Sequence, residues 1–323
     1  MDKARNSGCA SETLETEQVH CLLCGSSESE FLYALEDYYT GQPGRFALVK
    51  CLQCGGGYLN PRPTIGAMSA FYPSTYEPHA APSTHLSWLP RWLVQYGLWK
   101  RCRPLLMWRS PGKILDVGCG TGHFLAAMQK YGTWEVVGID LNPEAVAFAR
   151  SVLKIEAYTG KIEDIGLPPH IFDAVTMWDT LEHLRDPRSA LLGVWRVLKP
   201  DGRLLLRVPS LDSLDACLFG RYWAGLDAPR HLVVFSQKTL KRLLEETGFM
   251  VERLWCLSGG QASFILSLRL RFGRRDQAGW LRSVLLKIAT HPLVLILSMP
   301  YFFIMDRLLL GPEITVLAKK QAR

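Results

Sequence analysis

The feature that most constrains the fold is a regular alternation of apolar runs and helical patterns from Lys113 to the end of the chain. The runs are continuously apolar, which is typical of strands that are buried on both faces of a parallel sheet. The segments between them have the spacing of helices that would cover such a sheet. This pattern predicts an α/β fold whose strands lie at 113–118, 134–140, 155–159, 172–178, 203–210, 250–257 and 313–320.

A glycine-rich turn follows the first of these strands. Residues 114–122 read ILDVGCGTG and lead from the expected strand into an expected helix. Gly118 and Gly120 would let a ligand approach the backbone, beside the unpaired N–H groups of the helix N-terminus. Asp140, at the tip of the next strand, is placed to accept hydrogen bonds from two ribose hydroxyls. The glycine spacing differs from the G-x-G-x-x-G pattern of dinucleotide sites, and Asp116 precedes the first glycine.

This segment resembles motif I of the class I S-adenosylmethionine-dependent methyltransferases, and the resemblance extends from Lys113 to the C-terminus. FDAVTMWDTLEHLRDP, LKPDGRLLLRVPS and RHLVVFSQKTLKRLLEETGF resemble further segments of that family. The resemblance implies a Rossmann-like seven-stranded methyltransferase sheet and S-adenosylmethionine as the cofactor. Many relatives have Asp where this chain has Lys161, so the sequence departs from the family near the adenine. The cofactor-binding residues that the resemblance implies are Asp116, Gly118, Gly120, Asp140, Leu141, Ile162, Glu163 and Trp178.

Methyl transfer to a hydroxyl or an acidic carbon needs a base, because the acceptor must lose a proton. After the fourth expected strand, Asp179, Glu182 and His183 resemble the acid-x-x-Glu-His arrangement of ubiquinone O-methyltransferases, in which a divalent ion can be held against the acceptor oxygen. Carboxylate and imidazole ligands suit such an ion. The alternative is that no metal binds here and that His183 caps or hydrogen-bonds the backbone. Asp179 and His183 are candidate catalytic residues.

A second candidate base, His231, follows the fifth expected strand. Parallel sheets bind their ligands at the carboxyl ends of the strands, where this loop lies. Tyr222, Trp223 and Arg230 share the loop and would wall an acceptor pocket. The alternative is a structural histidine that packs on Trp223.

Two C-x-x-C pairs near the N-terminus indicate a metal site. Each pair is followed by glycine, as in zinc knuckles, and four thiolates without a spare ligand describe a closed structural zinc site. A redox function would need a thioredoxin-like context, which the sequence lacks. The flanking CGGGYLNPRP and FYPSTY resemble the N-terminal zinc module of bacterial sugar and secondary-metabolite methyltransferases. The expected zinc ligands are Cys21, Cys24, Cys51 and Cys54.

The chain therefore divides into four expected parts. They are a disordered lead at 1–18, a zinc-binding module at 19–62, a linker with an aromatic and basic helical region at 63–109, and a methyltransferase domain at 110–323 with an apolar insertion at 283–310. Residues 19–62 carry only Arg45, Lys50 and Arg62 as cations, so no nucleic-acid partner is expected. The N-terminus has no apolar signal segment and the cysteine count of nine is odd, which favours a reducing, cytoplasmic location.

Two segments indicate a membrane surface. Residues 288–305 contain no charged side chain over 18 positions, close to the roughly 20 of a membrane span. If 313–320 is the last strand, both flanks lie on one side of a bilayer, so the segment would be a hairpin in or on the membrane, or an apolar lid. Residues 86–109 mix tryptophan with Lys and Arg, as interfacial helices do. The net charge of +7 agrees with peripheral or monotopic membrane association. A buried core helix or an oligomer interface is the alternative for both segments.

These features together favour methylation of a lipophilic or lipid-linked acceptor, with O-methylation favoured because His183 and His231 are candidate bases. A soluble sugar or natural-product C- or O-methyltransferase is the first alternative. The second is a non-catalytic scaffold, against which the intact set of Asp116, Asp140 and the glycines argues.

Overall fold

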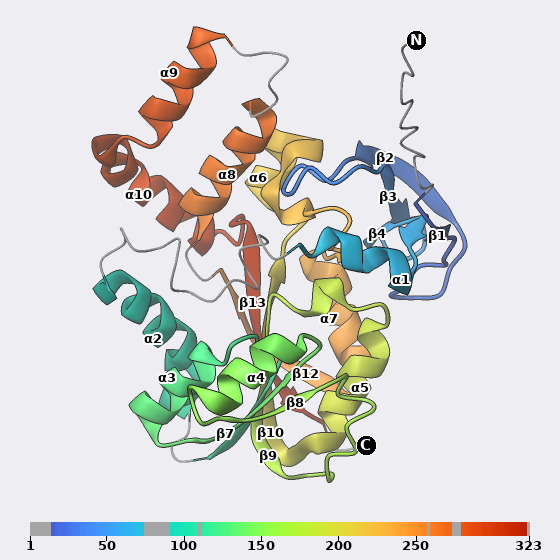
Figure 1. Ribbon diagram of the computed structural model, residues 1–323, viewed down its shortest axis with the longest axis vertical. Helices are drawn as coiled ribbons and strands as arrows, with labels where there is room; N and C mark the ends of the chain where they lie inside the picture. Colours follow the sequence, from blue (N-terminus) through green and yellow to red (C-terminus); the bar gives the residue numbers. More distant parts are fainter. Residues whose placement is uncertain (1–13, 74–90, 109–111, 257–258, 273–278, 322–323) are drawn as a thin grey trace, which may run out of the picture.

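The computed structural model describes residues 14–73, 91–108, 112–256, 259–272 and 279–321 (Figure 1). Its largest sheet has the strand order β12-β13-β10-β9-β6-β7-β8. Strands β8, β7, β6, β9 and β10 run parallel, whereas β13 is antiparallel to both of its neighbours. This is the expected seven-stranded methyltransferase sheet, so the predicted fold class is confirmed. The strands are β6 (Lys113–Val117), β7 (Glu135–Asp140), β8 (Glu156–Thr159), β9 (Phe172–Trp178), β10 (Leu198–Pro209), β12 (Phe249–Trp255) and β13 (Glu313–Lys320).

Helices cover both faces of this sheet. Neighbouring residues of a strand point to opposite faces, and in β6 Ile114 and Leu115 enter two different hydrophobic cores. The core of Ile114 is completed by α2 (Arg91–Trp108), α3 (His123–Gly132) and α4 (Pro143–Ser151). The core of Leu115 is completed by α5 (Pro187–Val197) and α7 (Gln237–Glu246). Burial on two faces explains why the strands are continuously apolar.

The N-terminal part forms a second sheet that the rest of the chain completes. Its order is β11-β4-β3-β2, all antiparallel. Strand β11 belongs to the loop after β10 of the large sheet, so this loop pairs directly with the N-terminal strands that carry the cysteines. The strands are β2 (Ser29–Leu35), β3 (Phe46–Cys51), β4 (Gly57–Leu59) and β11 (Val233–Val234).

The expected lead and linker are more ordered than their composition indicates. β1 (Thr16–Glu17) pairs with β5 (Arg62–Pro63), so the prediction of disorder as far as residue 18 is wrong at its end, while residues 1–13 lie outside the described chain. Short helices follow β5, namely α1 (Ile65–Met68) and η1 (Ser69–Phe71). Phe71 is buried and packs edge-to-face on Phe46, with ring centroids 5.5 Å apart. Trp88 and Arg109 of the expected helical region lie outside the described residues.

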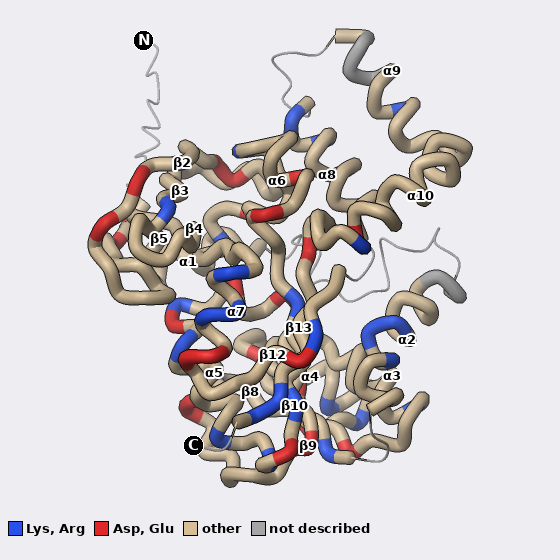
Figure 2. The backbone as a smooth tube through the Cα atoms, turned by 180° about the vertical axis from the view of Figure 1, so that it is seen from behind, with Lys and Arg blue, Asp and Glu red and all other residues tan. Residues whose placement is uncertain are grey.

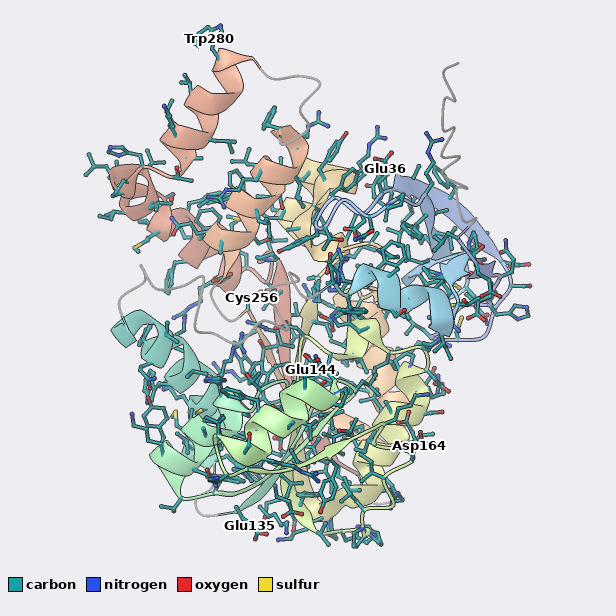
Figure 3. The ribbon with its side chains drawn as sticks, in the orientation of Figure 1. Glu36, Glu135, Glu144, Asp164, Cys256 and Trp280 are labelled. Carbon is teal, nitrogen blue, oxygen red and sulfur yellow. The ribbon has the colours of Figure 1, made fainter. Side chains whose placement is uncertain are left out.

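Helices also occupy both the loop after β10 and the connection between β12 and β13. The first holds α6 (Leu214–Phe219), η4 (Gly220–Tyr222) and η5 (Ala224–Leu226), and η3 (Leu181–His183) follows β9. The second holds α8 (Gly260–Phe272), α9 (Trp280–Ala289) and α10 (Pro292–Arg307). Figure 1 shows α9 and α10 standing away from the large sheet, and Figure 3 places Trp280 at the outer tip. No helix among the described residues combines the length and apolar character needed to cross a bilayer.

Candidate cofactor and acceptor site

The glycine-rich turn between β6 and α3 tolerates only glycine at its first position. Gly118 has a φ of +79°, and a Cβ placed on it would lie 2.3 Å from Oγ1 of Thr180. The Gly118 amide donates to the carbonyl of Ile139 at 2.8 Å, which holds the turn against the end of β7. The turn is therefore fixed between the loop after β9 and the end of β7.

Asp140 closes the other side of this turn. Its Oδ2 accepts a hydrogen bond from the Gly120 amide at 2.7 Å, and its Oδ1 accepts one from the Asn142 amide at 2.8 Å. Each carboxylate oxygen can accept a further bond, so two hydroxyls could still bind. The Gly160 amide donates to the Asp140 carbonyl at 3.0 Å, which brings the loop after β8 to the same point. The structure thus brings Asp140 to the glycine turn; its ribose contact stays a prediction.

Asp116 precedes the turn by two residues in β6, and Trp178 is the last residue of the neighbouring strand β9. The Asp116 carboxylate is buried and accepts a hydrogen bond from Thr176 Oγ1 at 2.6 Å. Burial raises the pKa of Asp116 to about 7. Arg101 of α2 lies over the Trp178 ring, with Cζ 5.5 Å from the centroid. Sequence reasoning missed Arg101 in this position, because the aromatic and basic composition of its helix was interpreted as a membrane surface.

The residues expected beside the adenine are less closely grouped. Ile162 is buried and lies against α5, since a Cβ on Gly193 would be 3.2 Å from its side chain. Glu163 is exposed, and Leu141 is 60% exposed beside Asp140. These three positions surround the end of β7 and the loop after β8, and their contact with a cofactor stays a prediction.

Asp179 is held by an arginine and does not join the expected catalytic group. Its Oδ1 accepts from Arg207 Nε at 2.8 Å, and Arg207 Nη1 lies 2.9 Å from a carboxylate oxygen of Glu313. Burial acts to raise the pKa of Asp179, but the charge and hydrogen bonds of Arg207 hold it below the ordinary value. A carboxylate engaged in this way is a poor base at this position.

Glu182, His183 and His231 converge instead. One ligand atom from each lies within 4.8 Å of the others. The two imidazole centroids are 4.6 Å apart. Nδ1 of His183 is 3.0 Å from the Arg230 carbonyl, and Nδ1 of His231 is 2.9 Å from the Gly225 carbonyl. Because a carbonyl only accepts, each Nδ1 donates, so any lone pair that an imidazole offers to a ligand is on Nε2.

The protonation of this cluster follows from its burial. Burial lowers the pKa of His183 to about 3, so its imidazole is neutral at physiological pH. Burial, and then the charge of Asp179, raise the pKa of Glu182 well above its ordinary value. Both carboxylate oxygens of Glu182 are buried without a hydrogen-bond partner among the described residues. Buried carboxylate oxygens normally have a partner, so this one is poised for a proton, an ion or a polar ligand.

Two of the residues that were expected to line an acceptor pocket beside His231, Trp223 and Arg230, are buried inside the protein. Arg230 is fully buried, with Nη2 2.9 Å from Asp37 and Nε 3.0 Å from Asp227, and it also donates to the Phe71 carbonyl at 2.9 Å. Trp223 is buried as well. Arg230 therefore joins the N-terminal part to the loop after β10 and does not face an acceptor.

The four expected cysteines form a compact group. Sγ of Cys21 is 3.6 Å from that of Cys54, and Sγ of Cys24 is 3.5 Å from that of Cys51. Tetrahedral zinc with bonds of about 2.3 Å separates its sulfur ligands by about 3.8 Å. The glycine after each pair has a left-handed φ, and its amide donates to the carbonyl of the first cysteine of that pair. The four thiolates fit a structural zinc ion.

Comparisons with known proteins agree with this arrangement. A family model described as a methyltransferase domain matches residues 97–254. The ubiquinone biosynthesis O-methyltransferase of Xanthomonas campestris pv. campestris (strain B100) is 40% identical over 115 residues, which are 32% of this chain and 48% of that protein. The chain thus spans about half the length of the curated relatives it matches first.

Two further matches cover a larger share of the matched protein. The ubiquinone/menaquinone biosynthesis C-methyltransferase UbiE of Vibrio cholerae is 30% identical over 195 residues, which are 51% of this chain and 75% of that protein. The solved S-adenosylmethionine-dependent methyltransferase of Mesorhizobium loti aligns with a TM-score of 0.47 and 18% identity, covering 69% of this chain and 98% of that structure.

Proposed function

Because this chain belongs to the class I S-adenosylmethionine-dependent methyltransferases, we propose that it transfers a methyl group from that cofactor to a hydroxyl oxygen of a lipophilic or lipid-linked acceptor. The observation that carries this proposal is the convergence of Glu182, His183 and His231, in which both imidazoles donate from Nδ1 to a backbone carbonyl and neither Nε2 has a partner among the described residues. Thr180, three residues before His183, lies against Gly118 of the glycine turn, so the cluster would lie near the expected cofactor.

The residues of the turn would hold the cofactor by charge and hydrogen bonds. The methyl group of S-adenosylmethionine is already activated, so the protein mainly supplies alignment and desolvation. Asp116 would face the cationic methionyl end, and Asp140 the ribose. Gly118 and Gly120 would line the methionyl end, and Trp178 would complete the wall. Ile162, Glu163 and Leu141 would surround the adenine.

The acceptor hydroxyl would lose its proton to the histidine cluster. His231 Nε2 is the favoured base, since burial lowers the pKa of His183 to about 3 and makes that imidazole a weak proton acceptor. The Gly225 carbonyl, 2.9 Å from Nδ1 of His231, orients its ring. The imidazolium that forms would favour ionisation of Glu182 beside it, because a nearby positive charge lowers the pKa of a carboxyl, and the resulting ion pair would stabilise the charged ring.

The same cluster fits a divalent ion. Two imidazoles and one carboxylate are a common ligand set for such ions, and imidazoles that ligate metals usually donate their other N–H to a carbonyl or carboxylate. The candidate ligands are Glu182, His183 and His231, in place of the sequence-based set with Asp179, which Arg207 engages. When bound, the ion would lower the pKa of the acceptor hydroxyl.

A lipophilic acceptor is supported by the apolar helices α9 and α10 and by the names of the relatives, which come from ubiquinone and menaquinone biosynthesis. Zinc at the four cysteines would have a structural role, because its four ligands leave no open position. Two alternatives remain. The acceptor could be a soluble sugar or natural product, or the chain could be a non-catalytic scaffold. One experiment distinguishes both from our proposal.

The experiment incubates the purified full-length chain with methyl-labelled S-adenosylmethionine and separated lipid and water-soluble extracts. We expect label in the lipid extract as an O-methyl product identified by mass spectrometry. His231→Ala should reduce transfer about a hundredfold, as expected for loss of a general base, while calorimetry shows unchanged cofactor binding. Asp140→Ala should reduce the binding itself. Label in the water-soluble fraction or on carbon would favour the soluble rival, and no cofactor binding would favour the scaffold.

The metal is tested separately. If the cluster holds an ion in place of acting as a free base, dialysis against a chelator should lower transfer, and Mg²⁺, which thiolates do not favour, should restore it in the unmodified chain and not in Glu182→Gln. Activity unchanged by chelation would show that the histidines act without an ion.

A further inference from the structure

Helix α10 exposes more apolar surface than a helix packed against a protein. It has no buried residue. Successive residues turn by about 100°, so its exposed apolar side chains cover roughly 200° of the circumference, about twice the width of the stripe with which a soluble helix packs. A flat protein partner would leave part of this surface in water. The exposed side chains are Leu293, Ile296, Leu297, Met299, Tyr301, Phe303 and Ile304.

The topology lets this helix dip into a membrane from one side. The connection leaves the sheet after Trp255 and returns to it at Glu313, and the two strands that carry these residues pair with each other. Both ends of this connection therefore lie on the same side of any bilayer. Figure 1 shows the hairpin standing away from the body, and Figure 3 shows Trp280 at its outer tip, where it is 78% exposed.

Helix α2 has the surface chemistry of a membrane interface. Tyr96 and Trp99 are exposed and stack with centroids 5.9 Å apart. Lys100 Nζ lies 5.6 Å from the Tyr96 centroid, and Arg103 Cζ lies 5.7 Å from that of Trp99. Met107, 71% exposed, continues the same face at helical spacing. Aromatic rings with flanking cations are typical of helices that lie at the headgroup level.

The two elements lie on one side of the molecule. Figures 1 and 2 show α2 and the α9–α10 hairpin on the same side of the molecule from opposite directions. Lys100 of α2 and Asp306 of α10 are close enough for their charges to act on each other. The apolar hairpin and the aromatic, basic helix can therefore meet one continuous surface.

The charge of this region indicates the kind of surface. Figure 2 shows α9 and α10 as mostly uncharged, with cations near their ends. Those cations include Lys287 and Arg307, and Arg307 lies over the Phe303 ring at 4.8 Å. Asp306 is the one acid among the described residues of α8, α9 and α10. Positive charge around an apolar centre complements a bilayer with negative headgroups.

We propose that α2 and the α9–α10 hairpin form a single docking surface for an anionic phospholipid bilayer. The hairpin enters one leaflet, and Lys100, Arg103, Lys287 and Arg307 lie at the headgroups. This inference does not depend on the proposed methyl transfer, because it concerns a surface and not the reaction.

The test sediments the full-length chain with sucrose-loaded vesicles of phosphatidylcholine alone, or of phosphatidylcholine and phosphatidylglycerol at about three to one, a mixture that supplies the anionic surface potential. We expect binding that rises with the anionic lipid. Leu297→Glu should weaken it about tenfold, since it removes an exposed leucine from the leaflet and adds a charge. Arg103→Glu should weaken binding to the anionic vesicles and leave binding to the neutral ones unchanged. The control is Ile65→Glu, at a site 71% exposed on α1, which should bind as the unmodified chain does.

Circular dichroism and cofactor calorimetry check that each variant is folded, and they also separate this test from the proposed activity. The proposal is overturned if the unmodified chain does not sediment, or if Leu297→Glu and Ile65→Glu weaken binding equally. The remaining alternative is that this surface binds a second copy of the chain, which light scattering tests. A dimer that Leu297→Glu converts to a monomer, together with no vesicle binding, would overturn the proposal.

Discussion

The buried ion network around Arg230 gives a quantitative test of how the N-terminal part is attached. Asp37 accepts hydrogen bonds from Nη1 and Nη2 of Arg230 at 3.0 and 2.9 Å, and both side chains are fully buried. Asp37 Oδ1 also accepts from the amides of Tyr39 and Thr40 at 3.0 and 2.9 Å. Asp37→Ala would remove all of these bonds and leave Arg230 with Asp227 as its carboxylate partner.

The magnitude follows from this geometry. Removing one partner of a buried ion pair costs roughly 3–5 kcal/mol, and the remaining contact to Asp227 favours the lower end, about 3 kcal/mol. The lost turn bonds add about 1 kcal/mol, so Asp37→Ala should lower the free energy of unfolding by about 4 kcal/mol. Glu30→Ala is the matched control, because Glu30 forms an exposed pair with Lys50 at 3.4 Å. Such a pair contributes no more than about 1 kcal/mol.

Urea unfolding, followed by tryptophan fluorescence and circular dichroism, measures both values. Burial acts to raise the pKa of Asp37, but hydrogen bonds from Arg230 and Thr40 hold it below the ordinary value. The stabilisation is therefore present above the ordinary carboxyl range and is lost as the pH falls through the folded-state value. The difference between Asp37→Ala and the unmodified chain should shrink in acid. A loss below about 1 kcal/mol at neutral pH, or one equal to that of Glu30→Ala, would refute the reasoning.

Three further outcomes test the site. Gly118→Ala should abolish cofactor binding in calorimetry, because its Cβ would lie 2.3 Å from Thr180 Oγ1, whereas Gly66→Ala, with no atom within 4 Å of its Cβ, should bind normally. Since burial raises the pKa of Asp116 to about 7, its anionic form is lost below neutral pH, and cofactor affinity should fall about tenfold from pH 8 to pH 6; Asp116→Asn should remove this dependence. Elemental analysis should find one zinc per chain, and a strong chelator should lower the thermal midpoint.

Much of the sheet could be predicted because the signals are local. A strand buried on two faces must be apolar at every position, and Phe172–Trp178 is buried throughout. The glycine turn is local too, since the left-handed φ of +79° at Gly118 favours glycine whatever surrounds it. Such features follow from a few neighbouring residues, and the strand and turn predictions depend on them.

The composition of the cluster of Glu182, His183 and His231 could not be predicted in the same way. Asp179 lies three residues before Glu182, yet Arg207 on the adjacent strand engages it. His231 reaches His183 across 48 positions of sequence because the loop after β10 folds back over η3. Likewise the pairing of Asp37 with Arg230 spans 193 positions. Contacts of this kind depend on packing, and sequence spacing alone does not specify which side chain points inward.

The cysteine module and the cluster of Glu182, His183 and His231 are coupled through one residue, Leu232. The Leu232 amide donates to the Glu182 carbonyl at 2.8 Å, and its carbonyl accepts from the Leu59 amide at 3.1 Å. β11 follows directly and pairs with β4, three residues after Cys54. His231 is thus held by a strand that the cysteine module orders, whereas the glycine turn is held by β6 and β7. Partial loss of zinc should therefore impair methyl transfer before it impairs cofactor binding, and equal loss of both would show that the coupling extends to the whole fold.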